Sequence, residues 1–188
     1  DLIPPAYETA GASALSILTD EKFFGGTLRD IRTARPLVNI PILRKDFIID
    51  KYQLLQARIV GADAVLLIAR ILEPSQLKEY LYTAWELGLD ALIEVHDERD
   101  ILVAEATPAE FIGINNRNLQ NFSTDIQHTL DLLPGCTGDW ILISESGIHC
   151  AADVARLRAA GVRGALVGEG LVRAASPGTK TKELAQAL

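Results

Sequence analysis

The sequence predicts an α/β fold, a (β/α)8 TIM barrel that is incomplete, with seven of its eight strands present. Short apolar strands alternate strictly with helices, which is typical of βαβ units and a parallel sheet. The glycine-rich turn of an open dinucleotide-binding sheet is missing. Polar residues recur at strand ends, and they converge only if the sheet curls into a barrel. A complete barrel has about 250 residues, so we expect residues 1–188 to be a single barrel domain lacking one βα unit at its N-terminal end.

In the first third of the chain, glycine and proline mark where each predicted helix ends. Gly11, Pro36 and Gly61 each follow a stretch of helical composition. The apolar runs between these helices predict strands, and the run around Val65 is apolar on both faces, as a parallel strand covered by helices should be. The predicted helices cover residues 4–10, 27–35 and 51–60, and the predicted strands cover residues 13–18, 39–44 and 63–69.

The same alternation continues to the end of the sequence. Gly88 lies just past the longest predicted helix, and a later amphipathic helix places Val154 and Leu157 on its inward face. The predicted helices cover residues 74–87, 98–106, 124–133, 151–160 and 179–188, and the predicted strands cover residues 91–95, 111–114, 140–144 and 165–167. The sequence therefore carries seven predicted strands in βαβ order.

The composition indicates a globular protein, with 48% hydrophobic and 23% charged residues. The net charge is −7 and the cations are scattered, which argues against a nucleic-acid surface and requires any anionic ligand to be held by a local site. Cys136 and Cys150 have no metal-ligand spacing, so we interpret them as free thiols in a reducing cytoplasm. No signal peptide or apolar run of membrane-spanning length is visible. Because the sequence has no Met and begins at Asp1, we expect it to be part of a longer protein.

The segment 41–47 ends a predicted strand in charged residues. Successive side chains of a strand point to opposite faces, so Leu43, Lys45 and Phe47 share one face, and Arg44 and Asp46 share the other. We interpret Lys45 as projecting into a reaction site at the carboxyl end of a parallel strand. The alternative is an ordinary solvated strand end.

Glu94 ends the strand 91–95 with a carboxylate. Two strand spacings separate it from Lys45, which predicts backbones about 10 Å apart and a gap that suits a small molecule between an acid and a base. The alternative is a structural ion pair. We interpret His96 as a rim or supporting residue rather than a catalyst, and we assign no role to His128 or His149. No cluster of His, Cys or carboxylate residues has metal-ligand spacing, so no metal is predicted.

Amide groups and a guanidinium follow the strand 111–114 directly. Asn115 and Arg117 have the same parity, so both are predicted to face the mouth of the barrel, where Asn orients substrate groups and Arg binds planar anions. The alternative is turn chemistry, which Asn favours.

Two glycine-containing loops, 144–148 and 167–171, follow the last two strands and lead into helices. Glycine lets backbone N–H groups approach an oxyanion, and the loops after strands seven and eight of such barrels frequently hold phosphate. If one strand is missing at the front, these loops occupy those two places. We therefore predict a phosphate site there, with capping and turn chemistry as the alternative.

These motifs together resemble the indole-3-glycerol-phosphate synthase family, a (β/α)8 barrel of tryptophan biosynthesis. The resemblance runs in order through nearly all 188 residues and is carried by the segments 18–24, 43–47, 92–96, 112–119, 144–147 and 167–169. It implies an enzyme that closes the indole ring of 1-(2-carboxyphenylamino)-1-deoxyribulose 5-phosphate and releases carbon dioxide and water, a carboxy-lyase without a cofactor.

The resemblance also implies a role for each matching residue. Lys45 would be the general acid on the substrate carbonyl, Glu94 the general base in the later dehydration, and Asn115 an orienting group. The residues implied to line the anthranilate pocket are Phe24, Phe47 and Leu66, and those implied to contact the substrate are Arg117, Leu119, Glu145 and Ser146. Backbone at Gly147, Gly168 and Glu169 would bind the phosphate, and Glu169 stands where some members have Ser.

One family motif has no match. The family's first strand carries a Lys-x-x-Ser-Pro-Ser type motif with a second lysine that holds the substrate carboxylate, whereas Lys22 is the only lysine before Lys45. Losing that anchor would weaken the stabilisation of the transition state by several kcal/mol. We therefore expect this chain alone to be weakly active or inactive.

The resemblance implies a phosphorylated small molecule as ligand, no nucleic-acid or membrane partner, and a monomer in the intact family. Two unpaired strand edges would make self-association of this chain an alternative. The rival readings are a non-catalytic fragment of a barrel and a sister barrel such as phosphoribosylanthranilate isomerase. That isomerase requires Cys and Asp as acid and base at strand ends, and neither cysteine here is so placed.

Overall fold

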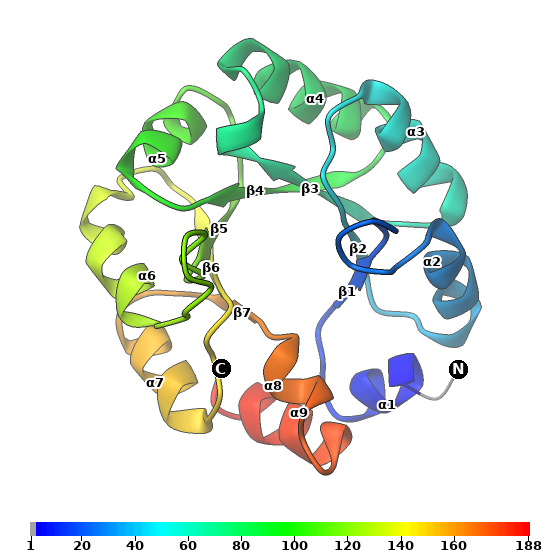
Figure 1. Ribbon diagram of the computed structural model, residues 1–188, viewed down its shortest axis with the longest axis vertical. Coiled ribbons are helices and arrows are strands. Elements are labelled where there is room, and N and C mark those ends of the chain that lie inside the picture. The colour runs from blue at the N-terminus through cyan, green and yellow to red at the C-terminus, as the bar shows by residue number, and fades with distance from the viewer. Residues whose placement is uncertain (1–2) are drawn as a thin grey trace.

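The computed structural model describes residues 3–188, and its strands form one parallel sheet in chain order (Figure 1). The strands are β1 (Leu15–Leu18), β2 (Ile42–Lys45), β3 (Ala64–Ile68), β4 (Asp90–Val95), β5 (Phe111–Asn115), β6 (Ile141–Glu145) and β7 (Gly164–Leu166). The sheet curls around a central axis, and β1 and β7 are its edges in the described part of the chain. The predicted incomplete barrel of seven strands is confirmed.

Helices cover the outer side of the sheet (Figure 1). They are α1 (Ile3–Thr9), α2 (Leu28–Ala34), α3 (Lys51–Val60), α4 (Pro74–Glu86), α5 (Glu98–Glu105), α6 (Gln127–Leu132), α7 (Ala151–Ala159), α8 (Glu169–Val172) and α9 (Pro177–Ala185). Short 3-10 turns occupy Arg35–Leu37, Ala69–Ile71 and Leu133–Gly135. Local chemistry sets the helix ends: the Asp50 carboxylate accepts the Tyr52 N–H at the start of α3, and Gly61 ends it in the left-handed region at φ 92°.

The strand register brings the polar strand ends to one level. Leu18 lies beside Lys45, Ile68 beside Glu94, and Asn115 beside Glu145. Side chains that alternate into the ring form an inner apolar cluster of Leu43, Leu66, Ile68 and Leu92. Those that alternate outward pack against the helices as the main core. The inner cluster therefore forms an apolar floor beneath the charged strand ends, as packing inside such barrels requires.

Several predicted boundaries differ from the structure. The second strand begins at Ile42 instead of residue 39, because the N–H groups of Asn39 and Ile40 bind the Glu8 carboxylate before the strand starts. α6 begins at residue 127 instead of 124, because Thr124 forms an isolated antiparallel bridge with Arg117. The first difference comes from a contact with a distant segment, which local composition does not record, and the second comes from a bridge within the loop before α6.

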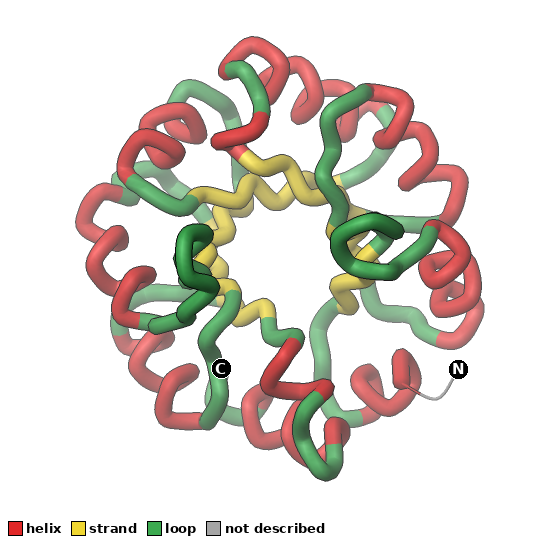
Figure 2. Tube along the Cα trace, in the orientation of Figure 1, coloured by secondary structure: helices red, strands yellow, loops and turns green. Residues whose placement is uncertain are grey.

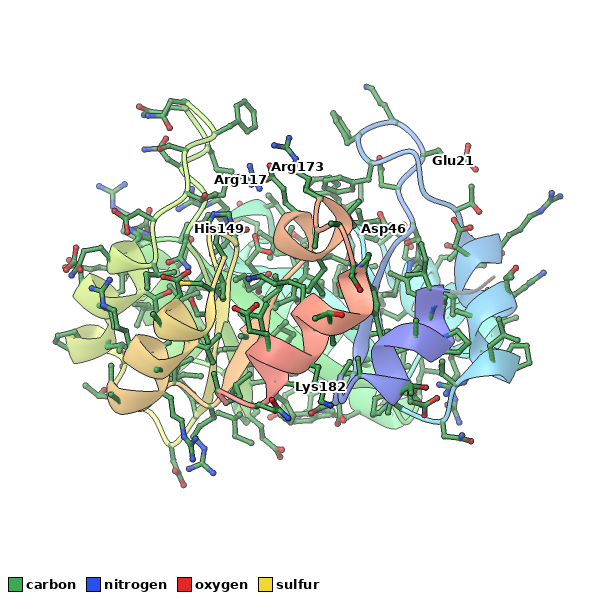
Figure 3. All side chains as sticks on the ribbon, turned by 90° about the horizontal axis from the view of Figure 1, so that it is seen from below. Glu21, Asp46, Arg117, His149, Arg173 and Lys182 are labelled. Carbon is green, nitrogen blue, oxygen red and sulfur yellow. The ribbon has the colours of Figure 1, made fainter. Side chains whose placement is uncertain are left out.

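Two long segments rise beyond the carboxyl ends of the strands. One joins β1 to α2 and carries Glu21, and the other joins β5 to α6 (Figure 3). Seen along the axis, both are loops that lie over opposite sides of the ring of strands (Figure 2). They form the walls of the barrel mouth.

Candidate active site

Lys45 lies between two carboxylates at the mouth of the barrel. Its Nζ is 3.0 Å from Oε2 of Glu94 and 3.0 Å from Oε2 of Glu145. The three residues come from β2, β4 and β6, so alternate strands deliver them to one point. The predicted orientation of Lys45 and Glu94 is therefore confirmed. The two long side chains meet directly as an ion pair, and a site for a small molecule between them stays a prediction.

The charges of this triad follow from burial and mutual attraction. Burial opposes the ammonium form of Lys45, but the nearby carboxylates of Glu145 and Glu94 outweigh it and hold the pKa of Lys45 above its usual value. Burial likewise opposes the ionised form of Glu94, but Lys45, His96 and a hydrogen bond from Asn115 lower its pKa. Lys45 is thus charged and able to donate a proton, and Glu94 is ionised and able to accept one.

Glu145 is the most deeply placed member of the triad. Its side chain is 1% exposed, and burial raises its pKa to about 7 despite the attraction of Lys45. A Cβ at position 113 would overlap Oε1 of Glu145, so Gly113 makes room for this carboxylate. In the structure the Glu145 carboxylate contacts Lys45. The contact of Glu145 with substrate that the resemblance implies stays a prediction.

The mouth also holds an aromatic cluster. The ring of Phe24, from the segment after β1, stacks on Phe47 with centroids 5.4 Å apart and an interplanar angle of 10°. Leu66 lies in the inner cluster with Phe47 packed against that cluster. Leu119 is on the opposite wall and is 49% exposed. Phe24, Phe47 and Leu66 thus line one side of the mouth, and Leu119 lies apart from them at the top of the other wall.

A buried cluster behind Lys45 was not assigned a role from the sequence. The Arg44 guanidinium donates to the Asp46 carboxylate at 2.7 Å, and Thr19 Oγ1 donates to the same oxygen at 2.6 Å. The other oxygen of Asp46 accepts the Phe47 N–H at 2.8 Å. Because Arg44 and Asp46 occupy the face opposite Lys45, they clamp the strand end that presents it. The alternation of 43–47 was the signal that located this pair on the outer face.

The two glycine-containing loops lie at the same end of the barrel. Ser146 and Gly147 both have left-handed backbone, at φ 67° and 72°. A non-glycine residue in this region is strained, and such strain is often found at functional sites. Gly168 immediately precedes α8, and the Glu169 side chain reaches Arg117 at 3.5 Å and Arg173 at 3.1 Å.

Asn116 holds the first of these loops, and sequence reasoning missed it. Its amide nitrogen donates to Ser144 Oγ at 2.9 Å and to the Ser146 carbonyl at 3.0 Å, and its oxygen accepts both the N–H and the hydroxyl of Thr129. The side chain is buried. Parity placed Asn116 on the face away from the mouth, so it was passed over in favour of Asn115, which contacts Glu94.

These features define a class. A curled parallel sheet with an ammonium, two carboxylates and glycine-containing loops at its carboxyl end is the arrangement of (β/α)-barrel enzymes that act by acid–base chemistry.

The comparisons with known proteins give the family. The model of the family "Indole-3-glycerol phosphate synthase" matches residues 3–184. The chain belongs to this family. It is 53% identical over 186 residues to the indole-3-glycerol phosphate synthase of Bacteroides thetaiotaomicron, covering 99% of this chain and 71% of that protein. It is 50% identical to the enzyme of the same name from Rhodopirellula baltica, covering 98% of this chain and 73% of that one.

Solved structures agree on the fold. A 3-hexulose-6-phosphate synthase from Salmonella typhimurium superposes with a TM-score of 0.75 at 18% identity, covering 93% of this chain and 86% of that one. A thiamine phosphate pyrophosphorylase from Pyrococcus furiosus gives 0.73 at 16% identity, with 98% and 87% covered. At these identities the likeness concerns the fold alone. Within residues 3–188, no helix is long and apolar enough to cross a membrane.

Proposed function

We propose that the chain carries out ring closure, decarboxylation and dehydration of 1-(2-carboxyphenylamino)-1-deoxyribulose 5-phosphate to indole-3-glycerol phosphate, as a carboxy-lyase of tryptophan biosynthesis. Membership of the family supports the substrate. The single structural observation that carries the proposal is Lys45, held at 3.0 Å from the carboxylates of Glu94 and Glu145 at the barrel mouth.

Lys45 would act first, as the general acid. Its pKa is held above the usual value, so the ammonium carries a proton at neutral pH and can give it to the substrate carbonyl oxygen as the new carbon–carbon bond forms. The substrate must enter between Lys45 and Glu94, which are in direct contact in the free protein. Binding therefore includes separation of this ion pair, and the substrate then provides the contacts that the two side chains lose.

Glu94 would act in the later dehydration, as the general base. Its carboxylate is ionised and is aimed at the mouth by Lys45 and Asn115. Glu94 takes a proton from the ring intermediate, and the hydroxyl formed from the carbonyl oxygen leaves as water after gaining a second proton from Lys45, which solvent has protonated again; this completes the aromatic indole. Glu145 remains below and keeps Lys45 directed upward after Glu94 has separated from it.

The remaining contacts follow the walls of the mouth. The stacked rings of Phe24 and Phe47 offer an apolar surface for the anthranilate ring. Arg117 offers a guanidinium for an anionic group of the substrate. Backbone N–H groups of Gly147, Gly168 and Glu169 are the proposed phosphate ligands. The Glu169 carboxylate is turned toward Arg117 and Arg173, which reduces its repulsion of a phosphate.

We further propose that turnover by this chain alone is weak. In the part of the chain that the structure describes, Lys45 is the lysine that pairs with the carboxylates of the mouth. Lys22 lies over the Phe23 ring, in the segment that joins β1 to α2. A second lysine for the substrate carboxylate has no counterpart among the described strands. β1 and β7 are the edge strands of the described sheet. Because edge strands can pair with strands of another chain, we propose self-association, with a monomer as the alternative.

The test is formation of indole-3-glycerol phosphate by the purified 188-residue chain, followed by chromatography and compared with the full-length relative from Bacteroides thetaiotaomicron. We expect slow turnover that disappears in Lys45→Met and persists in Lys51→Met, which changes a lysine on the outer surface. Binding of the product, followed by 31P NMR, should remain measurable even where turnover is undetectable. Absence of both turnover and product binding would contradict the proposal and favour a non-catalytic barrel. Turnover at the rate of the full-length relative would contradict the need for a second lysine.

A further inference from the structure

The imidazole of His96 lies buried between two carboxylates without an aligned hydrogen bond. Its Nε2 is 3.3 Å from Oε1 of Glu94, and its Nδ1 is 3.8 Å from Oδ2 of Asp100. Neither nitrogen has a hydrogen-bond partner among the described residues, and the side chain is 7% exposed. Buried polar atoms are nearly always paired, so this arrangement calls for an explanation.

The backbone around His96 is fixed on both sides. Its N–H donates to Asp100 at 2.8 Å, and its carbonyl accepts from Nε2 of His128 at 2.8 Å. Oδ2 of Asp100 also receives the Arg70 guanidinium, whose Nε lies 3.1 Å away. Because Asp100 Oδ2 is already supplied with donors, Oε1 of Glu94 is the acceptor that remains for the imidazole.

The charge state of the ring follows from its surroundings. Burial lowers the pKa of His96, and Arg70 and His128 lower it further, while Glu94 and Asp100 oppose them. The ring is therefore neutral at neutral pH and carries one hydrogen. These groups come from β4, α5, α6 and the 3-10 turn after β3. The shorter distance places the hydrogen on Nε2, toward Glu94.

We propose that His96 is a positioning residue for Glu94, with a neutral imidazole whose Nε2 lies 3.3 Å from Oε1 and carries the ring hydrogen, while Lys45 holds Oε2. This inference rests on the proposed function, in which Glu94 is the base. When Lys45 turns to the substrate, Glu94 loses its cation. His96 is anchored outside the mouth and keeps one oxygen of the carboxylate in place for the later step.

The first test measures the tautomer in the unmodified chain. The sequence has three histidines, so 15N NMR of histidine-labelled protein gives few signals, and His149→Gln and His128→Gln assign them by difference. We expect His96 to carry its hydrogen on Nε2 at neutral pH. A hydrogen on Nδ1, or a doubly protonated ring, would overturn the inference.

The second test follows the Glu94 carboxyl by 13C NMR in glutamate-labelled chains. His96→Leu removes the donor and should raise the Glu94 pKa by about one unit, a tenfold change in its ionisation constant. His96→Gln keeps an amide N–H near the same position and should restore most of the shift. His128→Leu disturbs the neighbouring carbonyl contact only and should leave the Glu94 titration unchanged.

Kinetics provide a readout that separates positioning from a purely structural role. His96→Leu should move the acidic limb of the kcat profile to higher pH and lower kcat about tenfold, with KM little changed and with rescue by His96→Gln. An unmoved acidic limb together with an unmoved Glu94 titration would refute the inference. If the unmodified protein shows neither turnover nor product binding, the proposed function fails, whereas the two NMR tests still decide the role of His96.

Discussion

Replacing Lys45 with Met tests the triad most directly, because it leaves Glu94 and Glu145 buried without their cation. Removing one partner of a buried ion pair costs about 3–5 kcal/mol. That is a large part of the roughly 5–15 kcal/mol by which a domain is stable. Both carboxylates would then have folded-state pKa values above their unfolded values. Their contribution to stability is complete below the unfolded pKa and is lost as pH rises through the folded pKa.

The loss should therefore depend on pH. We expect Lys45→Met to lower the free energy of unfolding by about 3–5 kcal/mol near pH 8 but by only about 1–2 kcal/mol near pH 5, where protonation of the carboxylates removes their charges. Urea denaturation at the two pH values measures this. The matched control is Lys51→Met, which breaks an exposed pair with Glu79 and should cost at most about 1 kcal/mol at either pH. Equal losses for Lys45→Met at both pH values would show that lost packing, not buried charge, is responsible.

Four further predictions concern the same region. Because burial raises the Glu145 pKa to about 7, the free energy of unfolding should fall as pH rises through 7, and Glu145→Gln should flatten that part of the urea-denaturation profile. Gly113→Ala places a methyl group against Oε1 of Glu145 and should cost about 1–3 kcal/mol, visible as a lower Tm. Phe24→Leu removes the stack on Phe47 and should raise KM about three- to tenfold at similar kcat in steady-state assays. Asn116→Asp loses both hydrogen bonds donated by its amide and should weaken binding of the phosphorylated product about tenfold by 31P NMR.

Much of the fold could be predicted from local pattern. The apolar runs and the glycine and proline stops located all seven strands, because strands buried on both faces and helices with defined ends leave strong signals in the sequence. Alternation along 43–47 also predicted which side chains of β2 face the mouth, and the structure agrees for Lys45 and Arg44. Helix α3 was predicted at its observed bounds, since Gly61 and the capping residues act within a few positions.

The relations between strands could not be predicted in the same way. The depth of Glu145 depends on an absent side chain at position 113, which lies on the neighbouring strand. The hydrogen bond from Asn116 to the Ser146 carbonyl depends on Thr129 of α6, which donates to the Asn116 side-chain oxygen and so fixes the amide. In each case the deciding neighbour is distant in sequence, and the residue types alone were also compatible with turns or solvated strand ends.

The triad also determines what an arriving anion meets. Two carboxylates and one ammonium at the mouth leave an excess of negative charge whenever Glu145 is ionised. A ligand with a phosphate and a carboxylate would add to that negative charge. Glu145, whose pKa is about 7, can offset the added charge by taking up a proton from the solution. Ligand binding and protonation of Glu145 are then linked, so the protein would bind such a ligand more tightly at slightly acidic pH than at slightly basic pH.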